Sequence, residues 1–352
     1  DASANPFCEG TSVTYTATPV NGGSSPAYQW KVNANNANNA NNAVFTYYPV
    51  SGDLVSCIMT SNLNCVTLNP ALSNTIIMVA AIRPTVTFTP CNDVITTPGA
   101  QPFKLKGGIP LGGFYSGPGV NPATGIFTPA AAGTGVKTIT YTYTNVASCN
   151  DFKTITITVL PVPSFTCGNN LTDARDGRHY NTFSLPNGRC WMQQNLDFGF
   201  TILDLLPQTD NCTPEKYERP TSFVPRPTFY QWDELMNYET SSGTQGICPA
   251  GWHVPTSAEW DELIAFYNGP GQAGGPMKDT LLVNEFHSIQ KGFLYQNNTW
   301  AFTTGLWAGS MYWTSTTSGN NRAVARGLNE YNPSVSKYVS LRSNAFGVRC
   351  VK

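Results

Sequence analysis

The sequence contains few charged residues and no run of like charges. Charged residues make up 12% of the 352 residues, about half the share of ~25% that is usual in soluble domains. The 20 Lys and Arg side chains are scattered along the chain, so no basic patch indicates a nucleic-acid partner or an anionic membrane surface. Thr, Asn, Ser and Gly take the place of the missing charges, as is typical of an extracellular β-protein.

Long apolar runs are also missing. No stretch approaches the roughly 18 apolar residues that a membrane-spanning helix needs, so we expect no membrane span. The chain begins at Asp1 instead of Met. We therefore expect either an exported protein whose signal peptide has been cleaved or a fragment of a longer protein.

The sequence lacks the motifs of common enzymes. It has no nucleophile elbow, zinc-protease, phosphate-loop, dinucleotide or EF-hand signature. The three histidines are far apart in the chain: His179, His253 and His287. The adjacent pairs Asp233/Glu234 and Asp261/Glu262 diverge on predicted helices, so neither makes the facing carboxylates of a glycosidase. We expect a non-enzymatic protein without a cofactor.

A metal site is not predicted either. Asp173 and Asp176 offer carboxylates, but Ca²⁺ requires six to eight oxygen ligands, and Arg175 and Arg178 lie in the same short segment. A tight hairpin at Asp176-Gly177 is the better interpretation of these residues, with calcium as the weaker alternative.

What the chain does contain is short β-strand patterns. Residues 1–82 predict one β-sandwich and residues 83–161 a second, because alternating or β-branched stretches are separated by Gly, Pro and Asn. The predicted strands are 11–17, 27–32, 44–48, 53–59, 74–80, 85–88, 101–105, 113–116, 136–143 and 152–159. The Asn-rich segment 33–43 predicts a mobile hairpin loop, and 160–163 a stiff extended linker.

Residues 162–352 change in character. Seven of the eight tryptophans lie here, and two capping boxes, Thr228–Gln231 and Thr256–Glu259, predict helices at 231–238 and 258–267. Their apolar stripes are expected in the core: Trp232, Leu235 and Met236 in the first helix, and Trp260, Leu263 and Ile264 in the second. Short strands at 291–295, 300–302, 311–315, 322–326 and 347–351 complete an α+β domain.

The ten cysteines form no CxxC pair, and their even number predicts disulfides and an oxidising compartment. Cys91 and Cys149 are the only cysteines of the second module and lie at strand ends, so we pair them and expect every bridge to stay within a domain. The first module has three cysteines and the third has five, so one of each is free or pairs elsewhere. The other candidate bridge residues are Cys167, Cys190, Cys248 and Cys350, and the partners of Cys8, Cys57, Cys65 and Cys212 stay open.

Six sequence motifs of the third domain resemble the Fibrobacter succinogenes major paralogous domain, which is abundant in surface proteins of Bacteroidetes and Fibrobacter. They lie at 173–180, 189–196, 230–235, 247–255, 312–316 and 347–352. The resemblance implies a C-type-lectin-like fold, in which a long-range Cys248–Cys350 bridge would tie the helical half to the last strand. The calcium-dependent sugar-binding motifs of many C-type lectins are missing. Relatives often carry further cysteines after the segment that corresponds to 212–217, whereas this chain has Glu218-Arg-Pro there. The resemblance therefore does not give a partner for Cys212.

The first two domains resemble the PKD-like and Ig-like repeats of giant Bacteroidetes surface proteins. The matches are 28–33 with 52–57 and 115–120 with 138–143. The resemblance implies an extracellular, cell-surface location and a spacer role.

One aromatic-rich stretch, 305–331, is the predicted ligand or partner surface. It combines side chains that are enriched where proteins recognise partners: Trp307, Tyr312, Trp313, Arg322, Arg326, Asn329 and Tyr331. The alternative interpretation places Trp307 and Trp313 in the core.

Two functions follow. The first is an adhesin-type binding protein whose sandwiches present a lectin-like domain to a glycan or protein on another surface. The alternative is a structural subunit that assembles with copies of itself, head to tail, into a fibre or surface layer.

Overall fold

A computed structural model describes most of the chain as two compact units. The described residues are 1–64, 66–91, 94–161, 165–203, 206–218, 227–279, 286, 288, 293–294, 300–301, 309–329 and 331–352. The first unit contains residues 1–87, 108–113 and 141–153, and the second contains 88–107, 114–140 and 154–352. With 38% strand and 7% helix, the chain is mainly β, as predicted. No helix among the described residues is long and apolar enough to cross a membrane.

The first unit is built from short strands in small sheets. Its strands are β1 (Phe7–Cys8), β2 (Val13–Thr16), β3 (Ala27–Val32), β4 (Asn35–Asn36), β5 (Val44–Tyr47), β6 (Leu54–Thr60), β7 (Ala71–Leu72), β8 (Ile76–Ile77), β9 (Ala80–Ala81) and β13 (Gly108–Ile109). β2 pairs with β5, the main sheet has the order β4-β3-β6-β7, and β8 also pairs with β6. β1 and β9 form a separate parallel pair.

The core of this unit depends on Trp30, which the alternation of β3 turns inward. Trp30 is 3% exposed, and its ring lies 5.9 Å from that of the buried Tyr15 on β2. Its indole N–H donates to the Asn42 carbonyl, and its backbone N–H donates to the carbonyl of the buried Ala40. The hairpin predicted at 33–43 is present, because β3 and β4 pair antiparallel, and these hydrogen bonds hold the segment against the core of the unit.

Two long strands, β17 (Gly135–Thr144) and β18 (Asn150–Val159), contribute residues to both units. In the second unit they form the sheet β11-β18-β17-β14, beside the sheet β12-β16-β15. The other elements here are β11 (Ile95–Thr96), β12 (Phe103–Lys104), β14 (Phe114–Ser116), β15 (Val120–Asn121), β16 (Ile126–Phe127) and α1 (Pro129–Ala132), with β10 (Thr87–Phe88) at the boundary. The predicted linker 160–163 lies partly outside the described residues.

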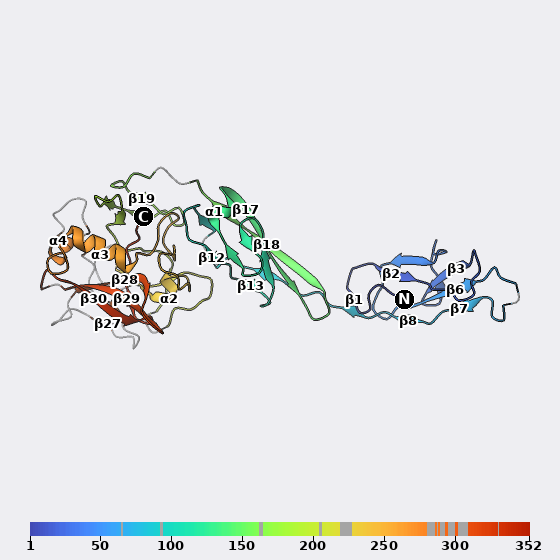
Figure 1. Ribbon diagram of the computed structural model, residues 1–352. Helices are drawn as coiled ribbons and strands as arrows, with labels where there is room; N and C mark the ends of the chain where they lie inside the picture. Colours follow the sequence, from blue (N-terminus) through green and yellow to red (C-terminus); the bar gives the residue numbers. More distant parts are fainter. Residues whose placement is uncertain are drawn as a thin grey trace. The chain divides into compact units, whose positions relative to one another are not determined.

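The rest of the second unit contains a six-stranded sheet with the order β23-β24-β25-β31-β26-β27, a three-stranded sheet with the order β28-β29-β30, and the two-stranded sheets β19-β20 and β21-β22. The strands are β19 (Leu171–Thr172), β20 (His179–Tyr180), β21 (Thr182–Ser184), β22 (Cys190–Met192), β23 (Phe200–Thr201), β24 (Glu215–Glu218), β25 (Thr228–Gln231), β26 (Phe293–Leu294), β27 (Trp300–Ala301), β28 (Gly309–Thr317), β29 (Arg322–Asn329), β30 (Val335–Leu341) and β31 (Ala345–Phe346). The helices are α2 (Trp232–Leu235), α3 (Ser257–Phe266) and α4 (Gly274–Lys278). Figure 1 shows α3 beside β28 and β29, which it contacts.

One of the two predicted capping boxes is confirmed. At α3 the Thr256 hydroxyl accepts from the Glu259 backbone N–H, and the Glu259 carboxylate accepts from the Thr256 backbone N–H. The other box is wrong, because Thr228 lies in β25 and its hydroxyl donates to the Leu196 carbonyl. Only the short helix α2 follows it. Both predicted apolar stripes are nevertheless buried.

The last strand pattern, 347–351, does not form a strand in a sheet. Gly347 bridges to Tyr312, while Val351 bridges to Trp191 and to His253. The C-terminal segment therefore passes among several elements and joins them through single bridges.

Four disulfides connect the chain among the described residues, and two of them cross the domain boundaries predicted from the sequence. Cys8 pairs with Cys149, and Cys91 pairs with Cys212. The predicted Cys91–Cys149 pair is therefore wrong, as is the expectation that every bridge stays within a domain, because pairing depends on which strand ends meet in the fold. The bridge Cys248–Cys350 is present as expected, and Cys167 joins Cys190.

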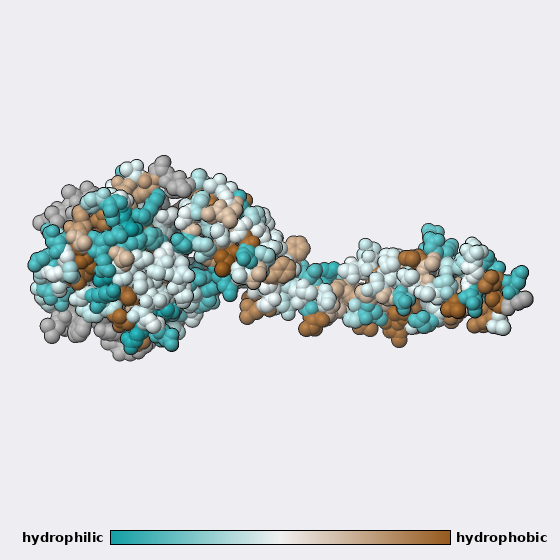
Figure 2. All heavy atoms as spheres, viewed as in Figure 1, coloured by the Kyte–Doolittle hydropathy of each residue, from teal (hydrophilic) through white to brown (hydrophobic). Residues whose placement is uncertain are grey.

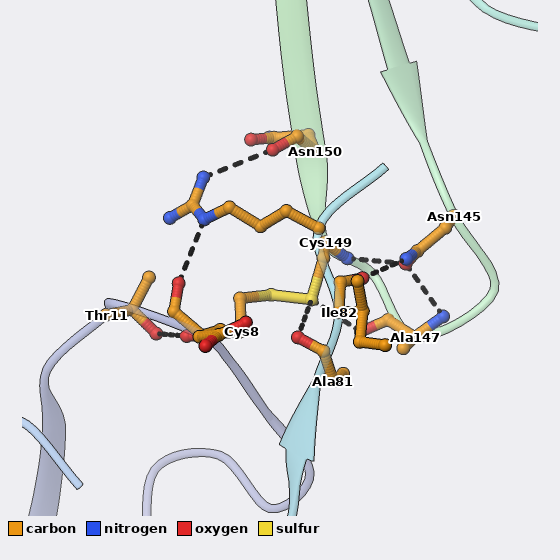
Figure 3. The surroundings of a disulfide bond; sticks show 10 residues. Cys8, Thr11, Ala81, Ile82, Asn145, Ala147, Cys149 and Asn150 are labelled. Carbon is orange, nitrogen blue, oxygen red and sulfur yellow. Dashed lines mark hydrogen bonds between the residues drawn. A yellow bond between two sulfur atoms is a disulfide. The ribbon is translucent and has the colours of Figure 1, made fainter. Parts of the chain in front are cut away.

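The Cys8–Cys149 bridge lies where β9 approaches the turn between β17 and β18 (Figure 3). The Arg83 side chain donates to the carbonyls of Glu9 and Asn150, and Asn145 donates to the Ile82 carbonyl. Hydrogen bonds from these side chains to backbone carbonyls thus reinforce the covalent connection. Cys57 is buried and has no disulfide partner among the described residues, and Cys65 lies outside them.

Candidate functional site

The structure does not bring the described residues of the predicted surface at 305–331 together into one surface. Tyr312 and Trp313 are fully buried, and Arg326 is 4% exposed. Alternate residues of β28 point to opposite faces, and both faces are covered. Tyr312 packs into one core cluster and Trp313 into another. The core alternative that the sequence left open is thus correct for Trp313.

Arg326 has a structural role instead of a binding role. Its guanidinium donates to the carbonyl and hydroxyl of Ser257 and to the Asp261 carboxylate at 2.6 Å. These contacts connect β29 to the first two turns of α3. The remaining predicted residues are separated: Arg322 and Tyr331 are exposed, Asn329 is half-buried, and Trp307 lies outside the described residues.

A pocket of about 440 Å³ in the second unit is the better candidate site. Its volume lies within the range of ~300–1,000 Å³ that is usual for small-ligand sites. One wall is the loop between β11 and β12, and the other walls come from the segment before α3, from α3 itself and from Lys352. The lining residues are Thr97, Gly99, Ala100, Gln101, Gly243, Gln245, Gly251, Trp252, His253, Thr256, Glu259 and Lys352.

The segment 248–256 holds the main wall in place. The Cys248–Cys350 bridge anchors its beginning, and the backbone of His253 exchanges two hydrogen bonds with Val351. Trp252 is 3% exposed and packs edge-on against Phe165. Since the segment then enters α3 at the capping box, the His253 side chain is directed to Glu259, six residues further on in the first turn of α3.

Glu259 is the most constrained charge of the pocket. One carboxylate oxygen accepts from His253 Nε2 at 2.8 Å and from Arg189, and the other accepts from the Thr256 backbone N–H at 2.7 Å. Burial raises the pKa of this carboxyl, but the bonds from His253 and Thr256 and the charge of Arg189 outweigh burial and lower the pKa below its usual value. Glu259 is therefore held ionised, with its acceptor sites occupied.

This arrangement suits binding better than proton transfer. A general acid or base must exchange its proton with a substrate, whereas the Glu259 carboxylate is already engaged by three residues. Amide, hydroxyl and imidazole groups of the lining offer hydrogen bonds to a polar ligand. At the rim, burial lowers the pKa of Lys352. The sequence did not predict the pocket. The motif at 247–255 and the capping box after it were the available signals, because both contribute lining residues.

The predicted Asp-Gly hairpin is confirmed between β19 and β20, where Gly177 takes a φ of +75°. Asp173 is buried, and its carboxylate accepts from the side chain of Arg175 at 2.7 and 2.8 Å. The guanidinium also lies over the Phe198 ring. Within the described part of the chain, no group of three or more His, Cys, Asp or Glu residues is placed to hold a metal ion.

A buried acid, Glu234, lies in α2. It is 4% exposed, and its carboxylate accepts from the Glu215 backbone N–H at 2.8 Å and from the Tyr238 hydroxyl at 2.9 Å. Burial is the main cause that raises its pKa from 4.5 to about 7, and the negative charges of Glu215 and Asp210 act in the same direction. The fold therefore favours the protonated form of Glu234.

We expect the stability of the second unit to fall as the pH rises from about 4.5 to about 7, because the folded state binds the Glu234 proton more tightly than the unfolded state. The substitution Glu234→Gln keeps a neutral side chain at every pH. Compared with the wild type, the variant should have a higher melting temperature at pH 8 and a similar one at pH 4.5. Its melting temperature should therefore depend less on pH between these values. Thermal melts of both proteins across this range check the prediction, and identical pH profiles would contradict it.

Comparison with known proteins addresses the C-terminal part of the chain. No match was found among curated proteins. Residues 186–352 match the family model described as the Fibrobacter succinogenes major domain. The matched region includes the segment 248–256, α3 and Lys352, and so most of the pocket, while the β11–β12 loop lies outside it. The C-terminal part of this chain is thus similar to the Fibrobacter succinogenes major domain, in agreement with the resemblance that its motifs carry.

Proposed function

We propose that this protein is a non-enzymatic, exported, adhesin-type binding protein of the cell surface. Residues 1–161 act as PKD-like or Ig-like spacers, and the C-terminal domain, with a C-type-lectin-like architecture, recognises a glycan or a protein on another surface. The pocket beside α3 is the binding site. The observation that carries the proposal is this pocket, which polar and apolar groups line together and whose constrained charges favour holding a ligand over reacting with it.

Two further observations support this function. The match to the Fibrobacter succinogenes major domain supports a surface-type protein. Four disulfides indicate an oxidising compartment outside the cytosol. Bridges also make a rigid support for binding loops, which lowers the entropy lost when a ligand is bound.

A structural subunit is the second candidate, and the surface of the first unit favours it. Large apolar side chains are exposed there, including Val20 (79%), Leu72 (64%), Ile77 (60%) and Ile82 (79%). Hydrophobic areas are visible on this unit in Figure 2. Exposed apolar surface marks protein–protein contacts when it is contiguous, so copies of this chain are the partner in this alternative.

Blocking the pocket tests the first function. Gln101 is exposed at the rim, so Gln101→Trp should fill the pocket without disturbing the core. Ligands found by screening the full chain on glycan and peptide arrays should bind this variant at least tenfold more weakly, which corresponds to about 1.4 kcal/mol, with an unchanged melting temperature.

The matched control is Gln272→Trp, which places the same side chain at an exposed position that does not line the pocket. It should bind like the wild type. Equal binding by both variants would show that the pocket is not the site. If no ligand is found and electron microscopy of the native surface material shows filaments, the structural subunit replaces the adhesin.

A further inference from the structure

Two of the disulfides interleave along the sequence. Cys8–Cys149 spans 141 residues and Cys91–Cys212 spans 121, so each bridge begins or ends inside the loop that the other closes. Cys167–Cys190 and Cys248–Cys350 close separate loops further along. This connectivity determines which parts of the chain carry a force that is applied at its two ends.

We propose that the interleaved disulfides make this protein an extension-limited tether, in which tension between the chain ends bypasses most of the polypeptide. Tension follows the shortest covalent path. From Asp1 it passes to Cys8, crosses to Cys149 and continues to Cys167. It then crosses to Cys190, continues through Cys212 to Cys248, and crosses to Cys350.

The chain outside the closed loops is short. The path contains about 85 residues, which at ~3.5 Å each extend to about 300 Å, whereas the whole polypeptide would extend to about 1,230 Å. Residues 9–148 and 249–349 are shielded, which includes the core around Trp30, β28 with its neighbours and most of the pocket residues. Under tension the chain can therefore lengthen only by unfolding the segments of the path, which in the second unit include β24, β25 and α2, while the two closed loops carry no end-to-end tension.

Interleaving also provides a reserve path. If Cys8–Cys149 is lost, tension runs from Asp1 to Cys91, crosses to Cys212 and then continues as before. This path contains about 130 residues and extends to about 450 Å. Cys91–Cys212 therefore carries no end-to-end tension while Cys8–Cys149 is intact and takes over when that bridge is broken.

Single-molecule force spectroscopy of the full chain, held by handles at both ends, tests the proposal. The oxidised wild type should reach a contour length of about 300 Å, and treatment with the reductant TCEP should increase the contour length to about 1,230 Å. The double variant C8S/C149S should reach about 450 Å, while C91S/C212S should stay at about 300 Å. With both pairs replaced, the length should reach about 790 Å.

The matched pair of double variants makes the test specific, because each removes one long bridge and only one of them should lengthen the chain. Non-reducing peptide mapping of each protein beforehand shows that the remaining bridges have formed. Partial reduction of the folded wild type supplies the same states if a variant does not fold. A wild type longer than about 450 Å, or equal lengths for the two variants, would overturn the proposal. Contour length does not depend on a ligand, so the result is independent of the pocket experiment.

Discussion

Replacing Arg349 by Met should lower the free energy of unfolding of the second unit by about 3 kcal/mol or more. Arg349 is 1% exposed and donates to the Asn195 side chain and to the backbone carbonyls of Gln193 and Phe286. Its guanidinium also lies 4.1 Å from the centroid of the Phe286 ring. Met fills a similar volume but donates no hydrogen bond, so three buried acceptors would lose the donor that faces them.

Denaturant unfolding of the two proteins measures this loss. The control is Arg322→Met, the same change at an exposed position of β29, which should alter the stability by less than about 0.5 kcal/mol. Similar small losses for both variants would show that the buried arginine does not hold the C-terminal segment in place.

The strands were the most predictable part of the fold. Residues 27–32 were predicted as a strand and form β3 with the same limits, because Trp30 must face the core while its neighbours face outward. The pattern at 74–80 was less informative. It contains several apolar residues in succession, and instead of one strand it contributes the short strand β8 (Ile76–Ile77) and the first residue of β9 (Ala80–Ala81). Alternation of inward and outward side chains predicts the limits of a strand well when one large side chain, such as Trp30, must be buried.

Helix limits and disulfide partners were less predictable, because both depend on contacts that are distant in sequence. The motif at Thr228 and Gln231 satisfies the local rule for a capping box, but pairing with β24 and β31 turns these residues into a strand. Similarly, the sequence favours a Cys91–Cys149 bridge only because both cysteines lie in one expected domain. The fold instead brings each of them to a cysteine beyond the predicted boundary.

The candidate site could not have been assembled from the sequence. Its lining comes from the β11–β12 loop, from the segment around His253 and from Lys352, which are far apart in the chain. The composition favoured 305–331 instead, because this stretch is rich in aromatic residues, Arg and Gly. Such a composition is typical of binding surfaces, but aromatic residues are equally common in cores. Distinguishing the two requires knowing that β28 is covered on both faces.

Replacing Tyr312 by Ala should therefore unfold or severely destabilise the second unit, with a loss of about 3–5 kcal/mol, as for large buried aromatic side chains. The Tyr312 ring lies 5.5 Å from that of Trp260 and 5.4 Å from that of Phe286, and its hydroxyl hydrogen-bonds to Ser288 at 2.7 Å. Ala leaves a cavity that the bridged C-terminal segment cannot close. Denaturant unfolding measures the loss.

Tyr331→Ala is the matched control, since this tyrosine belongs to the same aromatic-rich stretch but is 70% exposed. It should change the stability by less than about 0.5 kcal/mol. Tyr312→Phe separates the two contributions at the buried site: it keeps the ring and removes only the hydroxyl, so it should cost about 1 kcal/mol. If Tyr312→Ala folded as stably as Tyr331→Ala, β28 would have an exposed face. The stretch 305–331 would then again be the candidate binding site.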